Sequence, residues 1–147
     1  MSLQDWLNNR WLEEHQTSSQ EIADLLAIAD RDLSDCQISE LSADWKMNIA
    51  YNATLQLATI ALAASGYRAV REAHHYRIIQ SLTYTINFDT KLVTLFDQFR
   101  KKRNISGYDC AGMISDHEAN EMRNLAIHLR EEIIKWLYEN HPGLIDG

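Results

Sequence analysis

Residues that break helices are scarce in this chain, and this scarcity restricts its possible folds more than any other feature does. The 147 residues include one Pro and five Gly. An all-β chain would need turn residues about every eight to twelve positions. Hydrophobic residues make up 46% of the chain, enough to bury a core without disulfides. We therefore expect a single all-α domain over residues 1–147, an up-and-down bundle of about five to six helices with its core at about residues 20–140.

The helices can be placed from apolar periodicity and from end signals. Ser18 with Glu21 and Ser115 with Glu118 have the capping-box spacing that opens a helix, and Gly66 is suited to closing one. The expected helices are Leu3–His15, Ser18–Leu33, Ser39 or Ser42 to Ala64, a fourth after Tyr67 that carries Ile78 to Ile86, Thr90–Asn104, and Ser115 to about His141.

The uncharged run Met47–Tyr67 has about the length of a membrane span. Four polar residues form one stripe along it: Asn48, Asn52, Gln56 and Thr59. The stripe favours a buried helix of a soluble bundle, in which it is either a polar seam between helices or the wall of a cleft. Cys36 and Cys110 have no CxxC spacing, and the N-terminus has no signal-peptide pattern. We expect a cytoplasmic protein without membrane contact.

Charge is distributed unevenly along the chain. The net charge is −7, which argues against nucleic-acid binding if taken as an average. Residues 68–103, however, hold eight Lys and Arg against three acids, a local balance of +5 that leaves −12 for the remainder. An anion site therefore belongs in this middle segment.

The basic cluster Arg100–Arg103 closes the fifth expected helix, where positive charge is also favoured by the helix dipole. Arg103 continues the apolar row Leu92, Phe96, Phe99 at helical spacing, so it should point with the apolar face towards a partner or a cleft. The polar residues Asn104, Ser106, Tyr108 and Asp109 follow directly. A guanidinium beside hydroxyl and amide groups is suitable for holding phosphate.

Several segments together resemble one known family. They are Asp44-Trp45 with AYNATLQLA (50–58), SGYRA (65–69) with HHYRIIQSL (74–82), and FRKKRNISGYD (99–109) before a final amphipathic helix. Over roughly residues 23–138 the chain resembles HEPN domains, the "higher eukaryotes and prokaryotes nucleotide-binding" helical bundles. The resemblance implies a four- or five-helix bundle that forms homodimers. Many members are metal-independent ribonucleases, often toxins of toxin–antitoxin systems, and others are non-catalytic partners of minimal nucleotidyltransferases.

The ribonucleases of this family use an Arg-x(4–6)-His motif with a polar residue after the Arg. The resemblance places the arginine at Arg103 and the polar residue at Asn104. No histidine lies in the required window, where Tyr108 stands instead. A phenol with a reference pKa of about 10 is a poor proton shuttle at neutral pH compared with an imidazole at about 6.5. The sequence thus favours a nucleotide- or RNA-phosphate-binding module with little or no catalysis.

Two further groups of residues are candidates for function. Arg123 and His128 fit Arg-x(4)-His by letter, but they lie inside the last helix about 140° apart around its axis. His74 and His75 are adjacent and lack further ligands at useful spacing, so we expect no metal; one of them could face the basic cluster, or be a partly buried structural histidine. The tryptophans are expected to anchor the core or a dimer interface: Trp6, Trp11, Trp45 and Trp136.

Three functions stay open from the sequence. The first is the binding module, acting alone or as an accessory to a separately encoded nucleotidyltransferase. The second is a metal-independent endoribonuclease that uses Arg103 with Asn104 and Tyr108, or Arg123 with His128. The third is an oligomerisation domain with an incidental basic turn. No cofactor is expected, and the candidate phosphate-binding residues are Arg100, Lys102, Arg103, His74, His75 and Asn52.

Overall fold

The computed structural model describes residues 1–70, 74–106 and 114–145; for residues 74 and 103–106 it describes the backbone only. The elements follow one another as α1 (Leu3–Asn8), β1 (Leu12–Glu14), α2 (Ser19–Asp35), α3 (Ala43–Ala64), β2 (Tyr67–Ala69), α4 (His74–Thr85), α5 (Thr90–Ser106), α6 (Asp116–Asn140) and the 3-10 helix η1 (Pro142–Leu144). The described residues thus form an all-α helical bundle with one small two-stranded sheet, as the scarcity of Pro and Gly predicts.

Helix α3 lies at the centre of the bundle. It packs against α2, α4, α5, α6 and β2, and twelve of its 22 residues are buried. Six of those twelve are alanines or threonine, which let neighbouring helices approach closely, while Met47, Tyr51, Leu57 and Ile60 supply bulk. A helix that is apolar around most of its circumference must be covered on several sides, and this requirement sets the rest of the architecture.

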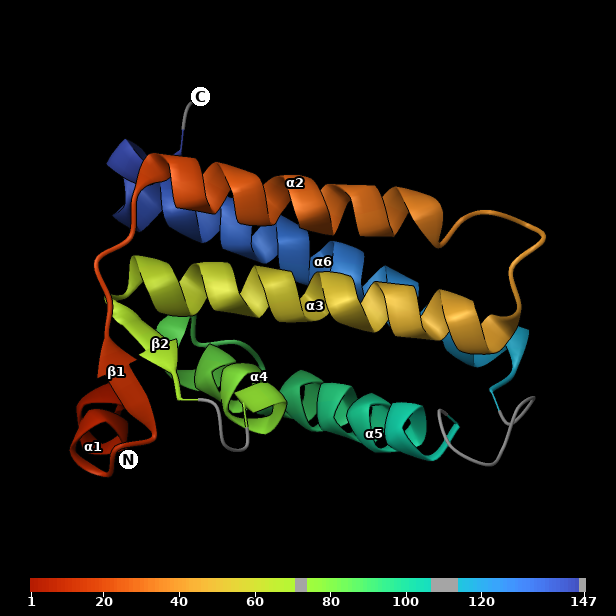
Figure 1. Ribbon diagram of the computed structural model, residues 1–147, viewed down its shortest axis with the longest axis horizontal. Helices are drawn as coiled ribbons and strands as arrows, with labels where there is room; N and C mark the ends of the chain where they lie inside the picture. The colour runs from red at the N-terminus through yellow and green to blue at the C-terminus, as the bar shows by residue number, and fades with distance from the viewer. Residues whose placement is uncertain (71–73, 107–113, 146–147) are drawn as a thin grey trace.

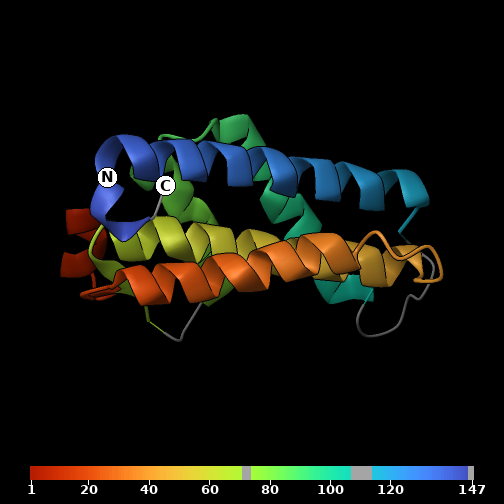
Figure 2. The same ribbon diagram turned by 90° about the horizontal axis from the view of Figure 1, so that it is seen from above.

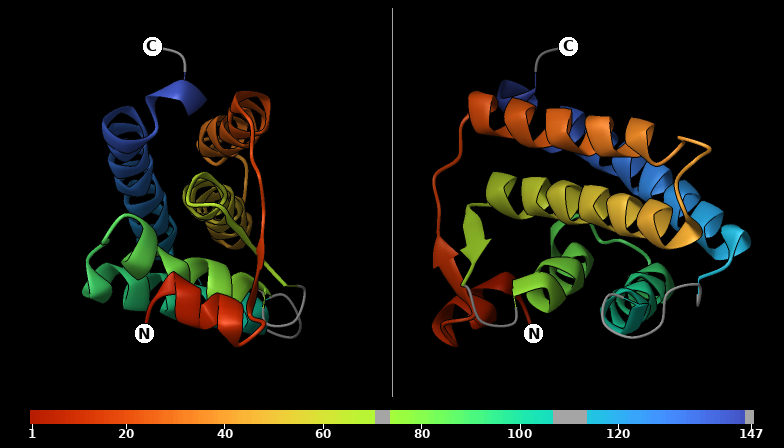
Figure 3. Two further views of the ribbon diagram at one scale, coloured as in Figure 1. Left: turned by 90° about the vertical axis from the view of Figure 1, so that its left-hand side faces the viewer. Right: turned by 45° about the vertical axis from the view of Figure 1, so that its right-hand side comes forward.

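The other helices cover α3 in two groups. Figure 1 shows α2 and α6 on one side of α3 and α4 and α5 on the other, and the end-on view in Figure 3 shows the latter pair crossing beneath the bundle. Seen from above, α2, α3 and α6 run roughly along one axis (Figure 2). Helix α2 is antiparallel to α3, whereas α3 and α6 point the same way because α4 and α5 return the chain between them (Figure 1).

Side-chain caps explain where the long helices begin. Ser18, Ser42 and Ser115 each accept a hydrogen bond from the backbone N–H three residues on. The capping box predicted at Ser115 is complete, because the Glu118 carboxylate also accepts from the Ser115 backbone. The one predicted at Ser18 is only half formed, since the Glu21 carboxylate binds Thr17 and His15 instead.

The prediction of a first helix over Leu3–His15 is wrong in its second half. Helix α1 ends at Asn8, and Arg10 adopts a left-handed backbone conformation with φ of 64°. Residues 12–14 then form β1, which pairs antiparallel with β2 in the register Leu12–Ala69, Glu13–Arg68 and Glu14–Tyr67. The same pairing removes residues 67–69 from the fourth helix, which begins at His74. Pairing between distant segments overrides the local helical spacing here.

The remaining predicted boundaries lie within two residues of the observed ones: α2 ends at Asp35 and not at Leu33, and α5 ends at Ser106 and not at Asn104. Helix α3 ends at Ala64, with Ser65 as its C-cap and Gly66 in a left-handed conformation at φ of 98°. The break between α4 and α5 contains Asn87 at φ of 55°, and α6 ends at Asn140, with His141 as its C-cap before Pro142. Of the tryptophans, Trp6 is buried, whereas Trp45 is 62% exposed and so is not a core residue.

No helix in the described residues has both the length and the apolar character that a membrane span requires. This holds for α3, which contains most of the uncharged run that begins at Met47.

Gly66 provides a direct test of the turn between α3 and β2. Its φ of 98° is unfavourable for L-residues, and a Cβ there would meet no atom within 4 Å, so strain is the only cost of a side chain. We expect Gly66→Ala to lower the free energy of unfolding by about 1–2 kcal/mol, measured by urea denaturation. Gly143→Ala is the matched control, because Gly143 also has open space but no left-handed φ, and should change stability by less than about 0.5 kcal/mol. Equal effects of the two substitutions would contradict this account of the turn.

Candidate functional site

The basic middle segment is brought together by the packing of α4 against α5. Arg77 lies on the first turns of α4, and Arg100, Lys101 and Lys102 lie near the end of α5. Both helices lie across the same side of α3 (Figures 1 and 3). Positive side chains from two helices therefore share one region of the surface.

Arg77 is held between aromatic rings. Its guanidinium carbon lies 3.6 Å from the centre of the Trp11 ring, 5.5 Å from that of Tyr76 and 5.7 Å from that of Trp6. Trp6 itself packs edge-on against Trp11 and Tyr84, with ring centres 5.9 and 5.3 Å apart. Trp6 and Trp11 of the N-terminal segment thus form an aromatic surface on which Arg77 of α4 stacks. A stacked guanidinium keeps its in-plane N–H groups available for a ligand.

Arg100 meets the same group of side chains from α5. Its guanidinium carbon lies 5.5 Å from the centre of the Tyr76 ring, and Tyr76 is 38% exposed. Tyr76 therefore contacts both Arg77 and Arg100. We refer to Trp11, Arg77, Tyr76 and Arg100 as the arginine–aromatic row.

The carboxylates nearby neutralise most of the described basic cluster. Arg100 Nε donates to Asp97 Oδ1 at 2.8 Å, and Lys101 Nζ lies 3.5 Å from Asp97 Oδ2. Lys102 pairs with Glu118 of α6, and this hydrogen bond, helped by the Ser115 backbone N–H, lowers the pKa of the Glu118 carboxyl.

Arg77 differs from its basic neighbours, because it forms no ion pair with a carboxylate of the residues that the structure describes. Its guanidinium contacts aromatic rings, so no described carboxylate competes with an anionic ligand for it.

Several residues predicted from the sequence lie partly or wholly outside the described residues. Arg103 and Asn104 belong to the last turn of α5, so the backbone of Arg103 follows that of Arg100 by about one helical turn. The side chains of Arg103, Asn104 and His74, and the whole of Tyr108, lie outside the described residues. His75 is half-buried on the α3 side of α4, with its ring centre 6.3 Å from that of Tyr51.

Asn52 lies in the seam between α2 and α3. Its amide nitrogen donates to Asp32 Oδ2 at 2.6 Å, and Asp32 is only 5% exposed. Arg31 binds the other carboxylate oxygen of Asp32 at 3.1 Å. The polar stripe could form either a seam between helices or the wall of a cleft, and Asn52 belongs to a seam. It does not lie at the arginine–aromatic row.

The residues of the second Arg-x(4)-His match contact different parts of the fold. Arg123 lies beside Cys36 at the end of α2, where burial raises the pKa of the thiol and the positive charge of Arg123 partly opposes this effect. His128 is exposed, and its ring centre lies 5.8 Å from that of Phe88 in the α4–α5 connection. The structure does not bring these two side chains together into one site.

Arg77, Tyr76 and Trp11 are candidate site residues that the sequence alone does not reveal. The segment HHYRIIQSL contains an aromatic residue next to a basic one, a combination typical of nucleic-acid contacts, but the two adjacent histidines are its more conspicuous feature. The stacking of Trp11 on Arg77 joins residues far apart in the chain, and no local pattern indicates it.

Comparisons with known proteins give no further guide, because no protein-family model, curated protein or solved structure matches this chain. Among the described residues, no group of three or more His, Cys, Asp or Glu side chains is arranged to hold a metal ion.

The hydrogen bond between Asn52 and Asp32 predicts that Asn52 contributes to the stability of the fold and not to ligand binding. We expect Asn52→Ala to lower the free energy of unfolding by about 1–3 kcal/mol, because the buried Asp32 carboxylate loses a hydrogen-bond donor. Anion binding should be unchanged. Gln56→Ala, one turn further along the stripe and without a described side-chain hydrogen bond, is the matched control and should cost less. Urea denaturation measures both, and a weaker anion affinity in a stably folded Asn52→Ala variant would contradict this assignment.

Proposed function

We propose that this chain is a HEPN-like module that binds a nucleotide or the phosphates of RNA on the α4–α5 face, with little or no catalysis of its own. The observation that carries the proposal is the arginine–aromatic row, in which the exposed Tyr76 ring lies next to two guanidinium groups from different helices. An exposed ring offers a base a surface for stacking, and adjacent arginines bind the phosphates that flank it.

The division of charge within the row supports a phosphate ligand. Arg77 has no described carboxylate partner, while Arg100 and Lys101 share the single carboxylate of Asp97. An incoming phosphate can pair with Arg77 directly and compete with Asp97 for the other two cations. The backbone of Arg103, the arginine that the HEPN resemblance selects, follows that of Arg100 by about one turn of α5.

The proposal also includes partners implied by the resemblance. A homodimer, and a separately encoded nucleotidyltransferase or the other component of a toxin–antitoxin pair, would be consistent with a module that binds without reacting. The lack of a histidine in the window after Arg103 supports a binding role over a ribonuclease.

Binding of single-stranded RNA tests the proposal. We expect Arg77→Gln and Arg100→Gln each to weaken the affinity for a fluorescently labelled oligoribonucleotide about tenfold. The slope of log affinity against log salt should fall by about 0.7 for each phosphate that the variant no longer binds. Arg103→Ala should act similarly. Fluorescence anisotropy at several salt concentrations, with a metal chelator present, measures both the affinity and the slope, and a parallel titration with ATP tests a mononucleotide.

The control for this series is Lys135→Gln, which removes an exposed positive charge on α6 and should leave RNA affinity unchanged. RNA should be recovered intact after incubation. If the unmodified chain cleaves RNA and Arg103→Ala does not, the protein is a metal-independent ribonuclease and not a binding module. Absence of binding to both RNA and ATP, or equal affinity in all variants, would overturn the proposal.

Asp97 should restrain binding, because it neutralises two cations at once. We expect Asp97→Asn to increase RNA affinity about three- to tenfold at low salt, with a smaller gain as salt rises. Glu139→Gln makes the same change in net charge at an exposed position of α6 and should alter the affinity less than about twofold. Equal gains in the two variants would show that overall charge, and not the release of Arg100 and Lys101, controls binding.

A further inference from the structure

A hollow lies apart from the arginine–aromatic row, beside the β1–β2 ribbon. It has a volume of about 240 Å³ and is enclosed by the start of α2, the end of α3, β2 and one residue of α4. This volume is somewhat below the roughly 300–1,000 Å³ typical of pockets for drug-sized ligands, so a smaller molecule fits it. The lining residues are His15, Glu21, Leu25, Thr59, Leu62, Ala63, Tyr67, Arg68, Ala69 and Ile78.

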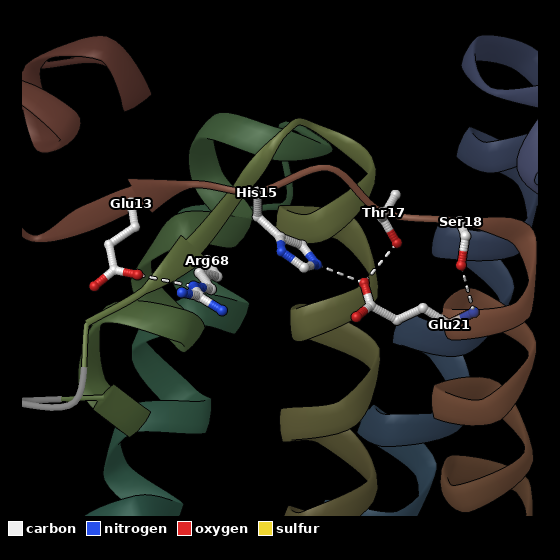
Figure 4. Close-up of polar contacts among 6 residues, drawn as sticks. All are labelled: Glu13, His15, Thr17, Ser18, Glu21 and Arg68. Atoms are coloured by element: carbon white, nitrogen blue, oxygen red, sulfur yellow. Dashed lines mark hydrogen bonds and ion pairs between the residues drawn. The ribbon is translucent and has the colours of Figure 1, made fainter.

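One side of the rim carries the ionised carboxylate of Glu21, whose two described hydrogen bonds both involve the same oxygen. His15 Nε2 and Thr17 Oγ1 both lie within hydrogen-bond distance of Glu21 Oε1, at 2.7 and 2.6 Å (Figure 4). These bonds lower the pKa of the Glu21 carboxyl, so the group is negative at neutral pH. No donor among the described residues hydrogen-bonds to Oε2.

The opposite side of the rim carries a guanidinium. Arg68 Nε donates to Glu13 Oε2 at 2.8 Å across the β1–β2 pair, and its terminal nitrogens form no described ion pair (Figure 4). The charge of Arg68 contributes to the lowered pKa of Glu21, yet the two side chains do not form an ion pair with each other. His15 lies between them in Figure 4. The rim therefore presents separated positive and negative groups that a dipolar molecule could join.

Apart from Thr59 and Tyr67, the lining beneath this rim is aliphatic. Leu62, Ala63 and Ile78 are nearly inaccessible in the folded chain, and Leu25 packs against the core from α2. A branched aliphatic group that enters the hollow loses its own contact with water, which favours binding by about 25 cal/mol per Å² of ligand area buried. A purely charged ligand would leave this part of the hollow unused.

We propose that this hollow binds a small zwitterion with an aliphatic side chain, namely a free apolar α-amino acid such as leucine. Its carboxylate pairs with the terminal nitrogens of Arg68, its ammonium with Glu21 Oε2, and its side chain rests on Leu62 and Ile78. A simple anion would meet the repulsion of Glu21, and a simple amine that of Arg68. This site is separate from the arginine–aromatic row and does not depend on the proposed RNA binding.

Isothermal titration calorimetry of the full chain tests the site with three probes of similar shape. L-leucine carries both charges, 4-methylpentanoate lacks the ammonium, and 3-methylbutylamine lacks the carboxylate. We expect leucine to bind with a dissociation constant below about 1 mM and each of the other two about tenfold more weakly or worse. Glycine, without a side chain, should also bind about tenfold more weakly.

The variants identify the rim groups. Arg68→Gln changes a largely exposed side chain and should weaken leucine binding about tenfold or more without loss of fold. Glu21→Gln should have a similar effect, with thermal unfolding as the check on its structure. Glu14→Gln, an exposed carboxylate of β1 outside the lining, should bind leucine like the unmodified chain. Leucine binding weaker than about 1 mM, unchanged binding in Arg68→Gln, or equal binding of 4-methylpentanoate would overturn the proposal.

Discussion

The need to bury α3 governs the rest of this structure. No charged residue occurs between Lys46 and Arg68, and the helix within this run is apolar on nearly every side. Such a helix is not stable in water by itself, so α2, α6, α4 and α5 each cover part of its circumference. The positions of both candidate sites follow from this arrangement. The arginine–aromatic row joins Trp11 to the pair of helices that cover one side, and the hollow lies where α2, α3 and β2 meet.

Sequence reasoning succeeds where the determining interactions are local. The starts of α2, α3 and α6 depend on serine side chains that bind backbone groups three residues away, and the end of α3 depends on one glycine conformation. It fails at residues 9–15 and 67–69, because these segments pair across more than fifty positions. The helical spacing of Leu3, Trp6 and Leu7 continues in the sequence through Trp11. Leu12, however, belongs to strand β1 and is buried there. Nothing in the first fifteen residues reveals their partner.

The candidate site shows the same division. The clustering of positive charge in residues 68–103 can be read from composition, and the helices that carry it are those expected. The sequence predicts the carboxylate partner of some of these cations but not of others. Asp97 is three and four residues from Arg100 and Lys101, so helical spacing indicates those pairs, whereas Lys102 finds Glu118 on another helix. Arg77 is distinguished only by a tryptophan from the N-terminal segment. Asn52 has the same polar character as a ligand residue, and only the position of Asp32 shows that it serves the packing of α2 on α3.

The order of the helices along the chain affects how the protein is made. Helix α3 is complete after 64 residues, but α6, which covers a large part of it, begins only at Asp116. During synthesis at about 5–20 residues per second, α2 and α3 leave the ribosome several seconds before α6 is available to pack against them. For that interval an extended apolar surface is open to water and to other nascent chains. A molecule interrupted before α6 would carry this surface permanently, which makes incomplete chains the species most prone to aggregate and most in need of chaperones.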